Sequence, residues 1–365
     1  MNTVRRAALA ATAIGLPVAV AFSSAAASAS DAQTGEPVEV AGLVVFASEY
    51  DVAETAQRVQ DALAEAGMVT ATVDHQANAE SVGAELRPTT LVIGGAPMAG
   101  TPLMLEDQRA GMDLPQKYLS WEDESGQVWL GYNSAEYVAA QAGIDTGSEA
   151  LAGLMEGSAG VAAGASGTAA AASEGAPVVV YENYLVEQVS DVSVEEAIAR
   201  YQGAFTAAGL MSPGTVDHQG GAESIGAELR PTQVTYAGNP ELGTPLIAAR
   251  QTMGIDLPTR FLAWQDENGT VNVGHVDINV LAERHGVTGV DDVLAMVEMG
   301  TGNLTSAAAG EDPQVGTTPE GGVDAGAGNT VGPENVGLLA LGVLSLLGAS
   351  VIAVRIRRPL GRDGA

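Results

Sequence analysis

Apolar and polar positions alternate along the chain with periods that predict both strands and helices. Residues 43–47 form a short unbroken apolar run, which is typical of a buried strand. In the next stretch the apolar side chains recur at helical spacing, at Val52, Ala56, Val59 and Leu63. Asp51 can cap this helix and Gly67 can end it. The pattern therefore predicts a strand followed by an amphipathic helix.

The pattern continues with further strands and helices to about residue 157. Alternation predicts strands at 70–75 and 89–93, and a hairpin of residues 116–121 and 127–132. Helices are expected at 77–85, 102–110, 134–142 and 149–156. Mixed strands and helices that end in a hairpin predict an α+β fold, a two-layer α/β sandwich with the helices on one face of the sheet.

The same residues return 143 positions later in the chain. Asp-His-Gln occurs at 74–76 and at 217–219, and Ala-Glu-Leu-Arg-Pro-Thr occurs at 84–89 and at 227–232. A period this long exceeds the roughly 20–50 residues of solenoid and propeller repeats. It therefore indicates a whole domain that has been duplicated.

Two segments are rich in small residues: one lies between the copies and one follows the second copy. The two tandem domains are predicted at 38–157 and 178–300, joined by an Ala/Gly/Ser linker at 158–177. A second such segment, 301–334, is expected to be a disordered stalk. Segments with so few large side chains bury too little apolar surface to offset the entropy of ordering them. We therefore expect both segments to be flexible.

The two ends of the chain predict a protein held on a membrane. Residues 1–29 are typical of a secretory signal peptide, and both the general and the twin-arginine pathway stay open. Residues 336–354 are apolar and long enough for a transmembrane helix, and the arginines of the tail 355–365 favour a cytoplasmic C-terminus. A processed sorting tail is the alternative. We expect a single-pass protein of the cell membrane with its domains outside.

Charge and motifs narrow the classes of function. The net charge of −30 argues against nucleic acid as a partner, because such a surface repels phosphate. The chain has no cysteine, which excludes disulfides and thiolate chemistry. Its sequence contains no nucleophile elbow and no phosphate-binding loop pattern. Binding is therefore favoured over catalysis, although enzyme activity stays undecided.

Spaced motifs in each copy resemble a known family. Both copies carry Asp-His, Leu-Arg-Pro-Thr, Gly-Thr-Pro and Asp-Leu-Pro at matching positions, and these are similar to the domain-of-unknown-function 302 (DUF302) family. The resemblance covers each whole copy. It implies a small α/β domain, often dimeric, whose biochemical role is not established. The second copy has the fuller pattern, at 238–240 and 284–286, so the first copy is the one expected to be degenerate.

The histidines are candidates for chemistry. His75 and His218 each follow an aspartate at a predicted strand end, and imidazole is a frequent ligand or proton carrier. A purely structural role is the alternative. His218 could also hold zinc or copper together with His275 and His285, although no metal-binding spacing supports this. No cofactor follows from the sequence.

Other candidates for ligand binding lie beside the predicted inner strand. Arg87 and Arg230 precede that strand and could hold a carboxylate or phosphate, or could pair with Glu85 and Glu228.

A strand-to-helix loop in the second copy carries two further candidates, Asn239 and Thr244. Free backbone N–H groups at such a helix start could attract an anionic ligand, although turn geometry also explains the loop. In the hairpins, Trp121 and Trp264 are expected to anchor the sheet to a helix.

The sequence supports three functional hypotheses. The first is a non-enzymatic extracytoplasmic module that binds a small ligand or a partner. The second is a metal- or haem-associated redox accessory protein that uses the histidines of the second copy. The third is an unrecognised hydrolase or isomerase with His218 as its base. If single-domain relatives pair, the two copies could also pair within one chain or in a homodimer.

Overall fold

The computed structural model describes residues 35–311. The predicted signal peptide, most of the predicted stalk, and the predicted transmembrane helix and tail therefore lie outside the described residues. No helix between residues 35 and 311 combines the length and the hydropathy that a membrane crossing requires.

Each copy builds one five-stranded antiparallel sheet. The first contains β1 (Leu43–Ala47), β2 (Met68–Asp74), β3 (Thr89–Gly95), β4 (Lys117–Glu122) and β5 (Val128–Asn133), in the spatial order β1-β5-β4-β3-β2. The second contains β6 (Leu185–Ser190), β7 (Thr215–Asp217), β8 (Thr232–Ala237), β9 (Thr259–Gln265) and β10 (Val271–Val276), in the equivalent order β6-β10-β9-β8-β7. The prediction of an α+β fold with two domains is confirmed.

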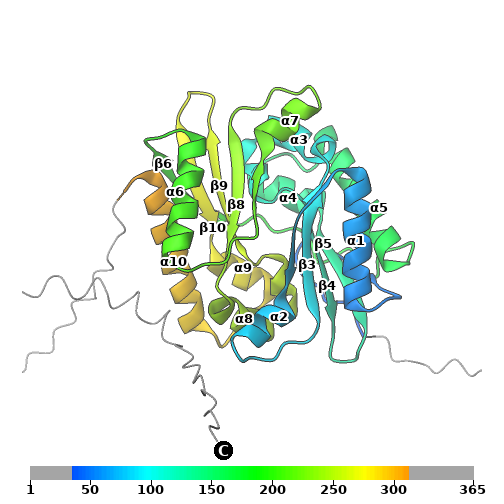
Figure 1. Ribbon diagram of the computed structural model, residues 1–365. Helices are drawn as coiled ribbons and strands as arrows, with labels where there is room; N and C mark the ends of the chain where they lie inside the picture. The colour runs from blue at the N-terminus through cyan, green and yellow to red at the C-terminus, as the bar shows by residue number, and fades with distance from the viewer. Residues whose placement is uncertain (1–34, 312–365) are drawn as a thin grey trace, which may run out of the picture. The chain divides into compact units, whose positions relative to one another are not determined.

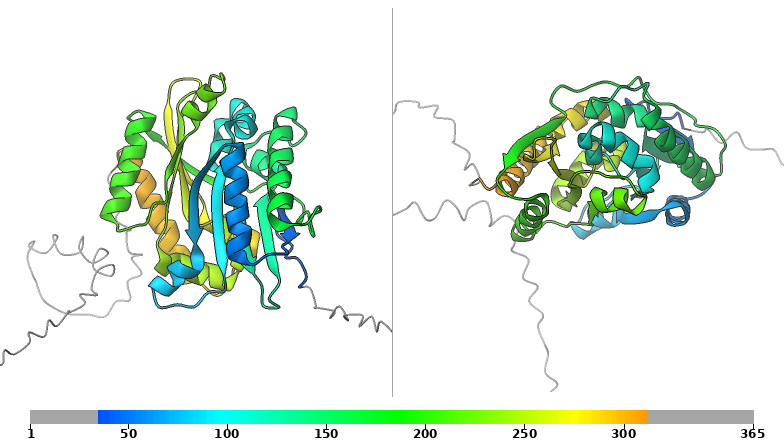
Figure 2. Two further views of the ribbon diagram at one scale, coloured as in Figure 1. Left: turned by 45° about the vertical axis from the view of Figure 1, so that its right-hand side comes forward. Right: turned by 90° about the horizontal axis from the view of Figure 1, so that it is seen from above.

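Long helices cover the outer face of each sheet, as Figures 1 and 2 show. They are α1 (Val52–Ala66) and α5 (Ala152–Ser166) on the first sheet, and α6 (Val194–Ala207) and α10 (Asp291–Ala309) on the second. Helix α1 begins where the sequence predicts, because the Asp51 side chain accepts a hydrogen bond from the backbone N–H of Glu54. Gly67 ends it.

Shorter elements connect the strands. The helices are α2 (His75–Ser81), α3 (Pro97–Glu106), α4 (Ala135–Ala142), α7 (His218–Ser224), α8 (Pro240–Ala249) and α9 (Ile278–His285). The 3-10 turns are η1 (Gln108–Met112), η2 (Glu149–Leu151) and η3 (Gln251–Ile255). The helix predicted at 102–110 instead starts at Pro97, because proline is well suited to the first position of a helix.

The inner faces of the two sheets share one hydrophobic core. Leu91, Leu119 and Trp121 of the first copy belong to the same buried cluster as Leu262 and Trp264 of the second. Residues of the opposite strand face, such as Tyr118, pack against α1 and α5 instead. Trp121 and Trp264 lie on the face that meets the other copy, in a cluster that also includes helix residues such as Tyr137 of α4 and Leu281 of α9.

The segment predicted to be a flexible linker is ordered over its whole length. Helix α5 continues through it to Ser166, and its buried face includes Ala162 and Ala165. The chain then runs along β1, where Ser173 pairs with Val45. Small side chains here allow close packing, which composition alone does not distinguish from flexibility. In the second copy α10 likewise extends to Ala309, into the start of the predicted stalk.

Candidate functional site

Each of the two equivalent histidines forms a hydrogen bond with the other copy. His75 is the first residue of α2, and its Nε2 lies 3.0 Å from the carbonyl oxygen of Gly254 in η3. His218 is the first residue of α7, and its Nε2 lies 3.1 Å from the carbonyl oxygen of Gly111 in η1. Both helices start here because the preceding aspartate caps them, so the helix predicted at 77–85 begins earlier and is shorter.

The tautomer of both rings follows from these contacts. A carbonyl oxygen only accepts, so Nε2 carries the proton and donates, and Nδ1 is left as an acceptor. Burial lowers the pKa of His75 to about 4, partly offset by the hydrogen bond to Gly254. Burial lowers the pKa of His218 to about 4 in the same way. Both histidines are therefore neutral near pH 7.

A glycine lies against each ring where it meets the other copy. A Cβ atom added to Gly254 would lie 3.2 Å from Cδ2 of His75, and one added to Gly111 would lie 3.1 Å from Cδ2 of His218. Both separations are tighter than ordinary van der Waals contact, so a larger residue would displace the ring. The repeat therefore encodes a reciprocal interface.

The arginines predicted to bind an anion instead bond across the same interface. Nε of Arg87 lies 3.3 Å from Oε1 of Gln251, and Nε of Arg230 lies 2.9 Å from Oε1 of Gln108. Neither arginine pairs with Glu85 or Glu228; among the described residues the acidic partner of Arg87 is Glu124. These arginines hold the copies together and lie away from the cavity described below.

A buried cluster of charges, which we did not predict from the sequence, lies between the copies. Asp256 accepts from Arg260 at 2.9 Å and from Arg284 at 2.9 Å, and Lys117 lies 3.6 Å away. Asp113 binds Lys117 at 3.0 Å and Arg260 at 3.0 Å. Burial alone would raise the pKa of Asp256, but Arg260 and Arg284 overcome this and hold its pKa well below the ordinary value. The available signal was an aspartate followed by a cation four residues later in both copies.

The histidines of the second copy do not form a common metal site. Both ring nitrogens of His285 are occupied, by Asp256 at 2.9 Å and by Thr252 at 3.0 Å. Nδ1 of His275 lies 2.7 Å from the hydroxyl of Thr305, and His218 faces the first copy. Within residues 35–311, no group of three or more His, Asp or Glu side chains is placed to hold a metal ion.

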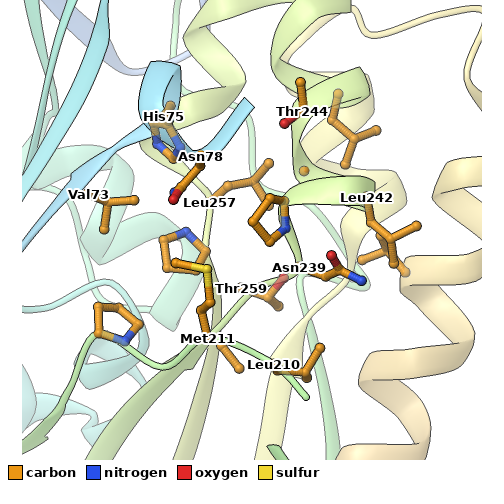
Figure 3. Close-up of a pocket in the computed structure, with 18 of the residues that line it drawn as sticks. Val73, His75, Asn78, Leu210, Met211, Asn239, Leu242, Thr244, Leu257 and Thr259 are labelled. Atoms are coloured by element: carbon orange, nitrogen blue, oxygen red, sulfur yellow. The ribbon is translucent and has the colours of Figure 1, made fainter. Parts of the chain in front are cut away.

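A cavity of about 420 Å³ opens beside His75 and is lined by both copies. His75 and Asn78 of α2 form one side, and Asn239, Leu242 and Thr244 form the other (Figure 3). The remaining wall is mostly apolar and comes from β9, from the segment after α6, and from α10. Three predicted ligand-binding residues, His75, Asn239 and Thr244, are thus brought together from different copies.

The equivalent space beside His218 is nearly closed, at about 60 Å³. There Gln116 fills the wall, and its Nε2 donates to the hydroxyl of Ser158 at 2.9 Å. The position 143 residues later is the smaller Thr259. Replacing a glutamine by a threonine therefore opens space on the second side.

The copies also differ in the side chains where two helices meet. Gly153 of α5 packs on α3, where an added Cβ would lie 3.6 Å from Cα of Ala99. The equivalent residues of the second copy are the larger Met296 and Leu242, and both line the open cavity. The open cavity therefore combines the loop of the second copy with the histidine of the first, and the first copy supplies part of the site.

Curated relatives match only part of the chain. They include the "Fluoride-specific ion channel FluC 1" of Brucella suis biovar 1 (strain 1330) and that of Brucella abortus biovar 1 (strain 9-941). Each is 40% identical over 119 residues, which is 32% of this chain and 47% or 44% of the relative. The chain therefore spans less than half the length of these relatives.

Among solved structures, an uncharacterized conserved protein DUF302 from Bacillus stearothermophilus is similar to one part of the chain. The TM-score is 0.32 at 15% identity, over 34% of this chain and 98% of that one. The model of the family described as "Domain of unknown function DUF302" matches residues 44–157 and 186–300, which together are more than half of the chain. The chain belongs to the DUF302 family and carries two copies of its domain.

Proposed function

We propose that this protein is a non-enzymatic, extracytoplasmic module that binds a small ligand in the cavity between His75 and the loop around Asn239. The observation that carries the proposal is the cavity itself, at about 420 Å³ against about 60 Å³ on the other side. Ligand sites are typically concave and mostly apolar, with a few polar groups that orient the ligand. The predicted signal peptide and membrane anchor support a place outside the cell.

The composition of the cavity rim supports a ligand rather than imperfect packing. Met211 and Met296, which belong to the lining, are 50% and 45% exposed. Methionine side chains are flexible and polarizable, and they are frequent at surfaces that adapt to different apolar partners. The cavity is therefore accessible from outside and bordered by side chains that can adjust to an occupant.

Gly300 offers a direct test, because it lies in α10 on the cavity wall and nothing is within 4 Å of a Cβ added there. We expect Gly300→Leu to occupy part of the cavity and to weaken binding of the neutral fluorescent dye N-phenyl-1-naphthylamine at least about tenfold, which corresponds to about 1.4 kcal/mol. The fold should be retained, since leucine is a better helix former than glycine by up to about 1 kcal/mol. Dye fluorescence titration measures the effect.

Gly302→Leu is the matched control. Gly302 lies in the same helix and also has nothing within 4 Å of an added Cβ, but it is not part of the cavity wall. The control should bind the dye as the unmodified protein does. Equal dye binding by all three proteins, or no binding by any, would refute the proposed site.

A further inference from the structure

We propose that the ligand of this cavity is an uncharged molecule with an apolar body that donates one hydrogen bond to Nδ1 of His75. This inference rests on the proposed function and specifies the class of ligand. It is carried by the charge of the walls and by the free ring nitrogen of His75.

The walls select against a charged anion. Among the described residues that line the cavity, none is a lysine or an arginine, and Asp74 is the one charged side chain. An anion there would lose water without gaining a countercharge, and Asp74 would repel it. The net charge of −30 on the whole chain acts in the same direction. The anion-binding groups expected from the sequence are already bonded: Arg87 and Arg230 lie elsewhere. At the start of α8, the backbone N–H groups of Glu241 and Leu242 both donate to Asn239.

The free acceptor is Nδ1 of His75. Nε2 is committed as a donor to the carbonyl of Gly254, so Nδ1 has a lone pair. Within residues 35–311, Nδ1 has no hydrogen-bond partner, yet it is not among the fully enclosed unpartnered atoms. His75 lines the cavity, and Nδ1 is the ring nitrogen left to a ligand there. A donor on the ligand would satisfy an atom that the described chain leaves open.

A threonine hydroxyl across the cavity shows the same contrast between the copies. Oγ1 of Thr101 in the first copy is fully enclosed without a partner. The equivalent Thr244 lines the open cavity, and its hydroxyl is not among the enclosed atoms. A hydroxyl can donate or accept, so Thr244 adds a second polar contact without favouring a charge. Apart from Asp74, whose carboxylate caps α2, the polar side chains at this site are neutral and suit a neutral ligand.

Three probes of matched size test the inference: 4-hydroxybiphenyl, 4-methoxybiphenyl and biphenyl-4-carboxylate, each in competition with N-phenyl-1-naphthylamine at pH 7. We expect the hydroxyl compound to bind about tenfold more tightly than the methyl ether, as one net hydrogen bond predicts. The carboxylate should bind most weakly. Tightest binding of the carboxylate, or equal binding of the hydroxyl compound and the ether, overturns the inference while cavity binding stands. Binding of no probe overturns the proposed function as well.

The variant His75→Phe tests whether His75 causes the preference for the hydroxyl compound over the methyl ether. His218→Phe is its control. Each loses one hydrogen bond between the copies, so their losses of stability are matched. We expect His75→Phe to bind the hydroxyl compound and the ether equally, whereas His218→Phe keeps the tenfold preference. Loss of the preference in both variants, or in neither, overturns the assignment to His75. If His75→Phe does not fold, the three probes on the unmodified protein still decide the class of ligand.

Discussion

Replacing Asp256 by asparagine is expected to lower the free energy of unfolding by about 3–5 kcal/mol, because it leaves buried cations without a countercharge. The Asp256 side chain is fully buried and touches Arg260, Arg284 and His285 at 2.9 Å each. Asparagine keeps the size of the side chain but loses the negative charge, and its amide N–H groups would face other donors. Unfolding in urea, followed by far-UV circular dichroism, measures the loss.

A surface pair provides the comparison. Glu124 lies 3.5 Å from Arg87, but its side chain is 88% exposed, so its contribution is screened by water. Glu124→Gln should change the free energy of unfolding by less than about 1 kcal/mol. Asp113→Asn should resemble Asp256→Asn, because Asp113 binds two of the three cations around Asp256, Lys117 and Arg260. An Asp256→Asn protein no less stable than Glu124→Gln would show that the cluster does not hold the copies together.

The cluster also explains why the two copies are not interchangeable. Tyr184 directly precedes β6 in the second copy. Its hydroxyl donates to Asp113 at 2.7 Å and accepts from Arg260 at 2.7 Å. Arg284 reaches the first copy, where it donates to Asn133 at 2.7 Å. The corresponding position in the first copy is Gln141, which cannot make these charged contacts. The interface is therefore reciprocal at the histidines and one-sided at the charges.

Periodicity predicted the elements that depend on local sequence. The apolar positions of α1, the cap at Asp51 and the glycine that follows the helix are local signals, and the structure agrees with them. The predicted helix ends were wrong where packing against a neighbouring element determines them. Helix α5 extends because the sheet buries Ala162 and Ala165, and this packing is absent from the local pattern.

The candidate site could be predicted only in its parts. His75, Asn239 and Thr244 are candidates from the sequence alone. They belong to different copies, however, and the repeat does not indicate which residues of one copy lie against which residues of the other. The cavity itself depends on small differences at equivalent positions, such as Gln116 and Thr259. Such differences change the volume of a packed interface without changing any motif, because interiors are close-packed.

Acid is expected to destabilise the paired copies over a defined range of pH. Burial lowers the pKa of His75 and of His218 to about 4 from an ordinary value of 6.5. Below pH 6.5 the unfolded chain takes up a proton at each histidine while the folded chain does not, so acid favours unfolding. The stabilising contribution is complete above pH 6.5 and is lost as the pH falls toward 4, on the order of 3 kcal/mol for each histidine.

Urea unfolding at pH 7, 6 and 5 measures this effect, and the two histidine variants isolate its source. Between pH 6 and 5 each buried histidine contributes up to about 1.4 kcal/mol per pH unit, so His75→Phe and His218→Phe should each reduce the slope by about that amount. Asp113 and Asp256 do not confuse the result: their folded pKa values lie below the ordinary 3.8, so the stability they add is lost only at lower pH. His275, whose pKa is also lowered to about 4, and His285, whose pKa is lowered by burial, should leave a residual slope in the double variant. A double variant with the slope of the unmodified protein would mean that neither histidine is buried and neutral, and the interface contacts at Gly254 and Gly111 would then be wrong.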